Sequence, residues 1–250
     1  MAEKANEAKT DFLSRMSHDI RTPMNVIVGM ASVARFVLQS EVKGTANLQC
    51  DEKTGNYAKL LNCLEKIEMS SAFLLSLIND ILDMSKIESG KMKIANREMN
   101  LKDAIRNIKV MIEAQAEERR QTFLVSVAPE VGEFYYCDSL RLNQVLLNLV
   151  GNAVRFTEKG GKVVITVAEK PGAVAGSANF EFCVEDTGIG MSQEFVKHIF
   201  EPFERENTTT LSGIAGTGLG MAITKNIVDM MNGAIEVKSK KGEGTKITVT

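Results

Sequence analysis

The chain has 250 residues, of which 44% are hydrophobic and 25% charged, values typical of a globular protein with one large or two smaller domains. Its formal net charge of −2 argues against a general nucleic-acid or membrane-surface binder, so we expect no nucleic-acid partner and no membrane contact by this segment. The four cysteines are far apart and form no CxxC pair, which argues against a zinc site or a disulfide framework and favours the reducing cytoplasm.

The first part of the chain predicts a helical hairpin. Apolar residues recur in alternating steps of three and four, from Leu13 to Val37 and again from Tyr57 to Ile81. The stretch between them, Gln39 to Asn56, loses this period and predicts a loop. Because one hairpin leaves much of its apolar seam in water, we expect two copies to pair as a four-helix bundle, which makes the protein a homodimer.

The remainder predicts a second domain of mixed α/β layers. Asn100 is placed to cap a helix that starts at Leu101, and Glu169–Asn179 predicts a loop. Strands are expected at Thr122–Ala128, Val163–Ala168, Phe180–Glu185, Ala234–Lys238 and Lys246–Val249. Further helices are expected at Ser139–Phe156, Ser192–Ile199 and Leu219–Met231.

A histidine lies on the polar side of the first predicted helix. At about 100° per residue, His18, Thr22 and Asn25 share a face opposite the apolar seam. Pro23 removes a backbone N–H in the helix interior and predicts a kink beside that face. A solvated, neutral imidazole can act as a nucleophile, but a surface helix can equally carry a histidine and a proline by chance.

Two asparagines lie one turn apart on the helix predicted at Ser139–Phe156. Asn148 and Asn152 stand on its polar side with Arg155, so their amide oxygens point the same way. Such neutral oxygen ligands suit a Mg²⁺ ion whose other ligands are phosphates and water. Solvated surface asparagines are the alternative interpretation.

Two glycine clusters follow. Asp186, Gly188 and Gly190 come directly after a strand, where a carboxylate can accept a hydrogen bond from an adenine amino group and the glycines allow a close backbone approach. A strand-ending turn is the alternative. The segment Gly216–Gly220 opens the last helix, where backbone N–H groups and the helix dipole favour a phosphate. The Thr/Ser/Gly-rich stretch between the clusters predicts a mobile lid.

Taken in order, these motifs resemble those of bacterial sensor histidine kinases, and hybrid-type kinases most. SHDIRTP at residues 17–23 resembles the phosphoacceptor box, and residues 148–157 resemble the asparagine box. DTGIGM and GTGLGMAI resemble two glycine boxes, with FEPFER resembling the phenylalanine box between them. The resemblance covers essentially the whole chain. It implies a dimerisation and histidine-phosphotransfer hairpin at residues 1–90 and a Bergerat-type α/β sandwich ATPase domain at 91–250.

The resemblance also implies roles for single residues. His18 would attack the γ-phosphate of ATP, Asp19 would act as its base, and Thr22 would position water when a partner's phospho-aspartate is hydrolysed. Asn152 would hold Mg²⁺. The residues implied to bind the nucleotide are Asn148, Asn152, Arg155, Phe156, Asp186, Gly188, Gly190, Gly216, Gly218, Leu219 and Gly220. Many relatives have lysine where this chain has Arg155, so the phosphate contact there is less secure.

The function implied is an ATP-dependent protein-histidine kinase that passes its phosphoryl group to an aspartate of a response regulator receiver domain, with a phosphatase activity toward that regulator. We expect the chain to be the cytoplasmic catalytic core of a longer kinase, whose input, membrane anchor and any further receiver domain the sequence does not define. Two alternatives are an ATPase clamp like that of gyrase, and a dimeric scaffold that binds nucleotide without transferring phosphate.

Overall fold

The computed structural model describes residues 24–25, 27–29, 31–36, 38–39, 51–172, 176–202, 204, 206 and 218–250, with only the backbone described at 51–60, 63, 66 and 70. The chain divides into two compact units, Met1–Met92 and Lys93–Thr250. Within the described residues, no helix is long and apolar enough to cross a membrane.

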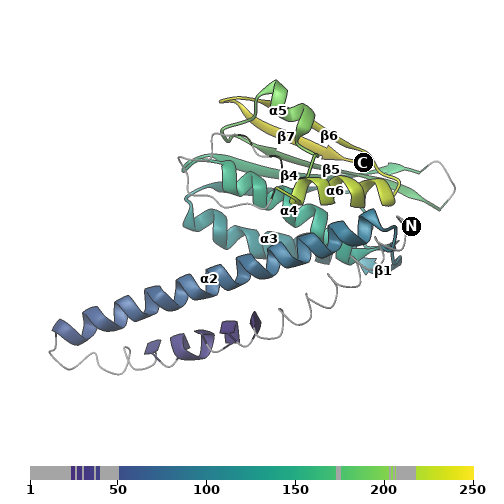
Figure 1. The fold of residues 1–250 in the computed structure, drawn as a ribbon. Coiled ribbons are helices and arrows are strands. Elements are labelled where there is room, and N and C mark those ends of the chain that lie inside the picture. The colour runs from purple at the N-terminus through teal and green to yellow at the C-terminus, as the bar shows by residue number, and fades with distance from the viewer. Residues whose placement is uncertain are drawn as a thin grey trace. The chain divides into compact units, whose positions relative to one another are not determined.

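The first unit contains the predicted helical hairpin. Its described residues between 24 and 39 are helical, and a long helix α2 (Asp51–Glu88) follows (Figure 1). The predicted loop is wrong at its far end, because α2 begins at Asp51 and not after Asn56. Glu68 of α2 joins the two helical segments, since it accepts a hydrogen bond from the Ser32 hydroxyl at 2.9 Å and pairs with Arg35 at 3.3 Å.

The apolar seam predicted on α2 is divided between two faces. Ser71 and Leu82 are buried, as are Met24 and Ala31 on the first helical segment. Ile67 and Leu74 were predicted in the same seam as Ser71, yet they remain 42% and 41% exposed. Ile27 of the first helical segment is exposed as well. The hairpin therefore has an apolar face that its own chain does not cover.

The second unit is built on a five-stranded mixed sheet. Its strands are β2 (Thr122–Val127), β4 (Lys162–Pro171), β5 (Ala178–Asp186), β7 (Gly244–Val249) and β6 (Ile235–Lys240), in that spatial order. Only β2 and β4 run parallel. The loop predicted at Glu169–Asn179 is shorter in the structure, because β4 continues to Pro171 and β5 starts at Ala178. A separate antiparallel pair, β1 (Arg97–Asn100) with β3 (Phe134–Cys137), was not predicted.

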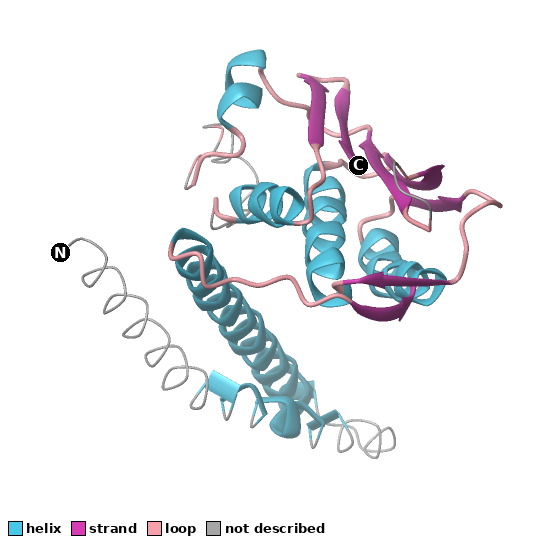
Figure 2. Ribbon diagram, turned by 90° about the vertical axis from the view of Figure 1, so that its right-hand side faces the viewer, coloured by secondary structure: helices cyan, strands magenta, loops and turns pink. Residues whose placement is uncertain are grey.

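Three helices lie on one face of this sheet: α3 (Leu101–Glu118), α4 (Ser139–Phe156) and α6 (Gly220–Met230) (Figures 1 and 2). The short helix α5 (Gln193–His198) packs beside β6. The buried face of α4 is formed by Leu142, Val145, Leu146, Leu149, Val150, Ala153 and Val154. It contacts the inward side chains of β4 and β5, such as Val163 and Val184, and this confirms the predicted α/β layers.

Capping groups fix the ends of these helices. Asn100 caps α3 as predicted, by accepting a hydrogen bond from the Asp103 N–H at 3.0 Å. The buried Asp138 caps α4 through the Arg141 N–H and also accepts from the Ala95 N–H. At the other end of α4, the side-chain amide of Gln121 donates to the carbonyls of Val154 and Thr157. Helix α4 is thus held at both ends, which matters because it positions the site.

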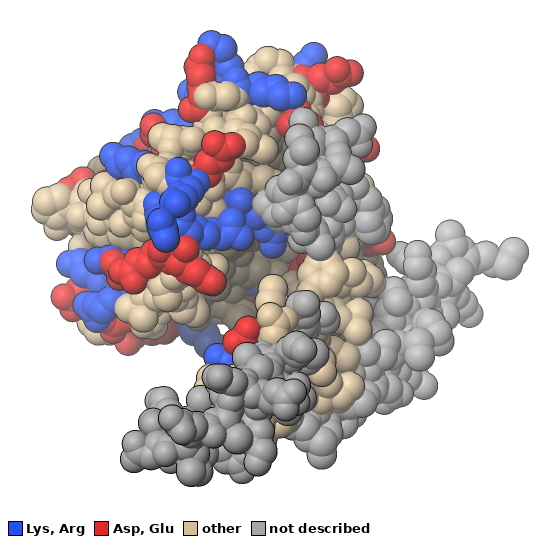
Figure 3. All heavy atoms as spheres, turned by 90° about the vertical axis from the view of Figure 1, so that its left-hand side faces the viewer, with Lys and Arg blue, Asp and Glu red and all other residues tan. Residues whose placement is uncertain are grey.

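Charges are mixed over the surface. On the face drawn in Figure 3, Lys and Arg side chains lie next to Asp and Glu side chains. Exposed ion pairs of the second unit include Lys170 with Glu181 and Lys246 with Glu185. Exposed pairs of this kind contribute little to stability.

Candidate functional site

Helix α4 brings the predicted nucleotide-binding residues of the second unit together. Asn148 and Asn152, in its middle, contact the first residues of α6. Phe156, at its end, contacts the loop that follows β5. The asparagines and the described end of the second glycine cluster, residues 218–220, therefore lie on one side of the site, and the Asp186 cluster lies at the other.

The α6 side depends on a close approach between helices. The Nδ2 of Asn152 lies 3.6 Å from the sulfur of Met221, and the Nδ2 of Asn148 lies 4.0 Å from the same atom. A Cβ atom added at Gly220 would lie 2.5 Å from the Oδ1 of Asn148, so a larger residue there would displace the Asn148 side chain. Gly218 takes a φ of 72°, which turns the chain into α6. The N-cap residue Leu219 makes no side-chain cap hydrogen bond, and the N–H groups at the start of a helix favour an anion.

The loop after β5 is held against the end of α4. The Ile189 N–H donates to the Phe156 carbonyl at 3.2 Å. A Cβ at Gly188 would lie 2.4 Å from that carbonyl oxygen, and one at Gly190 would lie 2.0 Å from the carbonyl oxygen of Lys240. Gly190 also has a φ of 60°. Both glycines are therefore required by the packing of this loop.

Asp186 is a partly buried carboxylate at the start of that loop. Burial raises its pKa, while hydrogen bonds from the Gly188 and Thr245 N–H groups oppose this rise by favouring the ionised form. The Gly188 N–H lies 2.8 Å from the Oδ1 of Asp186. A fixed carboxylate of this kind can accept a hydrogen bond from an exocyclic amino group of a purine.

Two hydroxyl residues that sequence reasoning missed support the same loop. The Ser239 hydroxyl accepts a hydrogen bond from the Met191 N–H at 2.8 Å and contacts the Thr245 hydroxyl, also at 2.8 Å. Both residues belong to the β6–β7 hairpin, in which Gly242 of the turn and Gly244, the first residue of β7, have positive φ. Those two closely spaced glycines were the available signal for a tight hairpin, but the sequence gives no indication that it packs against residues 186–191.

The donor set fits Mg²⁺ only as an ion that arrives with phosphate. Among the described residues, no group of three or more His, Cys, Asp or Glu side chains could hold a metal. The side-chain oxygen of Asn152, Oδ1, accepts no hydrogen bond in the described part of the chain. One neutral amide oxygen suits Mg²⁺ that keeps its waters and takes its remaining ligands from a nucleotide.

Several predicted residues lie outside the described part of the chain: His18, Asp19, Thr22, Pro23, Gly216 and most of the predicted lid. Arg155 is described, and its backbone carbonyl accepts a hydrogen bond from the Arg119 guanidinium at 3.4 Å. His198, at the base of the predicted lid, is exposed and pairs with Glu201 at 2.8 Å. That carboxylate raises the pKa of the imidazole.

Two family matches cover most of the chain. Residues 8–90 match the His Kinase A (phospho-acceptor) domain. Residues 137–250 match the family described as histidine kinase-, DNA gyrase B- and HSP90-like ATPase. Among solved structures, full-length ShkA in complex with AMPPNP has a TM-score of 0.69 and 27% identity, over 96% of this chain and 45% of that one.

Curated relatives give the same assignment. The chain is 38% identical to the sensory/regulatory protein RpfC of Xanthomonas campestris over 98% of its length, and covers 31% of that protein. It is 36% identical to the autoinducer 2 sensor kinase/phosphatase LuxQ of Vibrio parahaemolyticus over 100% of its length, and covers 27% of it. The chain thus spans about a third of the length of these relatives. It belongs to the sensor histidine kinases and consists of the phospho-acceptor and ATPase domains that form the catalytic core of a histidine protein kinase.

Proposed function

We propose that this chain transfers the γ-phosphoryl group of ATP to His18 and then to an aspartate of a response regulator receiver domain. One observation carries the choice of nucleophile. The chain has two histidines, and His18 is the one within the region that matches the phospho-acceptor domain. The other, His198, lies in the second unit and pairs with Glu201.

The chemistry follows from the nucleophile. An unprotonated ring nitrogen of His18 attacks the γ-phosphorus, the bond to the bridging oxygen breaks, and ADP leaves with the electron pair. Asp19 accepts the proton that the ring loses. In the second transfer, a carboxylate oxygen of the receiver aspartate attacks the phosphorus and the P–N bond breaks, which restores His18. When the protein acts instead as a phosphatase of the regulator, Thr22 positions the water that hydrolyses the phospho-aspartate.

The second unit would supply ATP in the required position. Asp186 accepts a hydrogen bond from the adenine amino group, and the first turn of α6 binds the phosphates. Asn152 would hold Mg²⁺, which neutralises negative charge on the phosphates when it is bound. Support for this arrangement comes from the contacts of α4 with Gly220 and Met221 in the first turn of α6 and with the loop after β5.

We also propose that the core works as a homodimer in the cytoplasm, where ATP and receiver domains are found. The exposed apolar residues Ile27, Ile67 and Leu74 support this, because a second hairpin would cover them in a four-helix bundle. Without such a partner, these apolar side chains would remain in water, which costs free energy.

The deciding experiment is incubation with γ-labelled ATP and Mg²⁺, comparing the wild type with His18→Gln and with His198→Gln as the matched control. We expect an acid-labile, base-stable label on the wild type and on His198→Gln, and none on His18→Gln. Subsequent addition of a receiver domain should move the label to an acid-stable, base-labile acyl phosphate. Release of free phosphate without protein label would instead support the ATPase clamp, and nucleotide binding without either product would support the scaffold.

A further inference from the structure

The side-chain amide of Asn148 is already engaged within the protein. Its Nδ2 donates to the hydroxyl of Thr224 at 2.7 Å. Thr224 lies on the second turn of α6, and at 1% exposure it is one of the few buried polar residues of this unit. The bond is partly buried, because Thr224 is buried while Asn148 is of intermediate exposure, so loss of the hydroxyl removes a partner that water replaces only in part.

The same side chain also meets the backbone of the first turn of α6. The Cβ position of Gly220 lies 2.5 Å from the Oδ1 of Asn148, closer than any side chain would permit. Asn148 therefore approaches α6 at Gly220, Met221 and Thr224. These contacts hold the first two turns of α6 close to α4.

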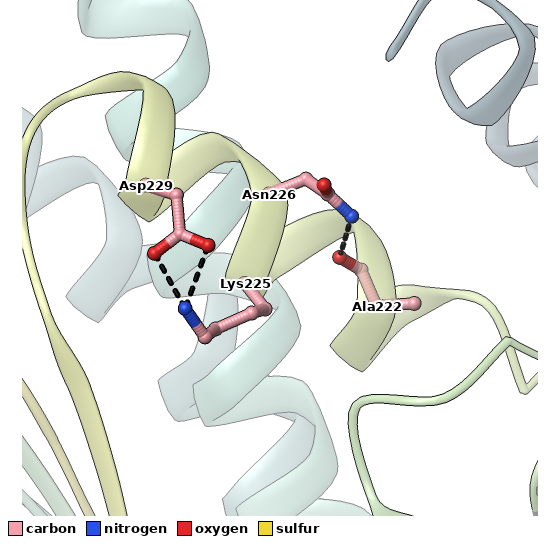
Figure 4. Close-up of polar contacts among 4 residues, drawn as sticks. All are labelled: Ala222, Lys225, Asn226 and Asp229. Atoms are coloured by element: carbon pink, nitrogen blue, oxygen red, sulfur yellow. Dashed lines mark hydrogen bonds and ion pairs between the residues drawn. The ribbon is translucent and has the colours of Figure 1, made fainter. Parts of the chain in front are cut away.

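Other polar side chains of α6 do not make this connection. Lys225 pairs with Asp229 and Asn226 donates to the Ala222 carbonyl, so both bond within the helix (Figure 4). The contact from Asn152 to Met221 goes through a sulfur atom, which is a weak acceptor. Among the described side chains of α6, Thr224 thus makes the strong hydrogen bond to α4.

We propose that Thr224, acting through Asn148, is a positioning residue that sets the first turn of α6 for the phosphate groups of the nucleotide. In this division of roles, Asn152 faces the ligand, and Asn148 affects binding through α6 and not as a ligand itself. The proposal rests on the proposed function, because it assumes that the first turn of α6 binds the phosphates. It predicts that loss of the Thr224 hydroxyl weakens recognition of phosphate and leaves recognition of adenine intact.

The test compares Thr224→Val with Thr224→Ser, which keeps the hydroxyl, and with Thr166→Val, the same change at an exposed position of β4. Affinities for ATP, ADP and adenosine are measured by calorimetry and by NMR titration with the intact chain. We expect Thr224→Val to bind ATP and ADP about tenfold more weakly, the scale of one lost hydrogen bond, and to bind adenosine as the wild type does. Thr224→Ser should restore the phosphate affinity, and Thr166→Val should leave all three unchanged.

Three results would overturn the proposal: equal losses for all three ligands, unchanged ATP affinity in Thr224→Val, or a loss that Thr224→Ser does not restore. If Thr224→Val did not fold, Thr224→Ala would replace it, because its smaller side chain leaves room for a water beside Asn148. A wild-type protein that bound neither ATP nor adenosine would contradict the proposed function itself, a result that differs from every outcome above.

Discussion

At the scale of single residues, the clearest conflict between stability and function is at Asp186. Its carboxylate is partly buried, and burial raises its pKa although two backbone N–H groups bond to it. A carboxyl group whose pKa is raised by folding destabilises the folded state when it is ionised, and this cost disappears as the pH falls through the raised pKa. The protein therefore keeps a charge in an unfavourable place, as expected of a group that recognises a ligand.

Asp186→Asn tests this conflict directly. We expect the variant to lose ATP binding, because the amide no longer offers two acceptor oxygens, and to unfold at a higher temperature than the wild type at pH 7. As the pH falls below the raised pKa, the wild type becomes protonated and the difference in Tm should shrink. Calorimetric melting at several pH values measures this, and a Tm gain that stayed constant down to pH 3 would contradict the pKa argument.

His198 gives a second prediction at this scale. The Glu201 carboxylate 2.8 Å from its Nδ1 raises the pKa of the imidazole, so the pair is strongest below about pH 6.5 and weakens as the pH rises through the raised pKa. In Glu201→Gln, the NMR titration of His198 should shift to lower pH, toward the value of a free imidazole. Glu236→Gln, an exposed carboxylate on β6, serves as the control and should leave the titration in place. An unchanged titration in Glu201→Gln would show that the contact does not persist in solution.

At the scale of elements, glycines near the site are required for two different reasons: a positive φ, and lack of space for a Cβ atom. Gly190 and Gly242 both have positive φ, but a Cβ would lie 2.0 Å from the Lys240 carbonyl oxygen at Gly190 and would meet nothing within 4 Å at Gly242. Alanine should therefore cost about 1–2 kcal/mol of backbone strain at either position, and considerably more at Gly190. Only Gly190→Ala should also weaken adenosine binding, because the loop that carries Asp186 would have to move. Thermal melting and adenosine titration of the two variants measure this, and equal effects on both would contradict it.

Helices and strands could be predicted where their apolar residues showed a clear periodicity. The buried face of α4 and the Asn100 cap of α3 follow from spacing and from capping preference, and both are confirmed. The strands β1 and β3 escaped prediction because four residues are too few to show a clear alternation. The start of α2 was misplaced because Gly55 and Asn56 suggested a turn, although the helix includes both.

The sequence could predict which residues form the candidate site, but it could not predict which of them contact one another. Its glycines and asparagines could be identified because their chemistry suits phosphate and metal. The Asn148–Thr224 bond and the support of the 186–191 loop by Ser239 could not be predicted, because each joins segments about 50 to 80 residues apart. The spacing of residues within one helix or loop gives no information on such pairings.

At the scale of the whole molecule, the hairpin has more apolar surface than a single copy can bury. Residues such as Ser71 and Leu82 pack within the chain, whereas Ile67 and Leu74 lie on a neighbouring face of α2 that stays exposed. One heptad pattern therefore served two purposes, and this is why the predicted seam combined buried and exposed residues. The exposed face is the structural basis for the homodimer proposed above.

Leu74→Glu should break that dimer. A glutamate there would place a charge in the centre of the proposed bundle, where burial without a partner is strongly unfavourable. Ser76, two residues further on, lies about 200° around the helix and is exposed, so Ser76→Glu adds the same charge away from the interface. Sedimentation analysis should show monomers for Leu74→Glu at concentrations where the wild type and Ser76→Glu are dimers.

Since Leu74 faces outward within its own chain, helical content by circular dichroism should fall little. A Leu74→Glu protein that remained dimeric would move the interface to another face of the hairpin, and a dimer lost equally in both variants would indicate a general effect of charge.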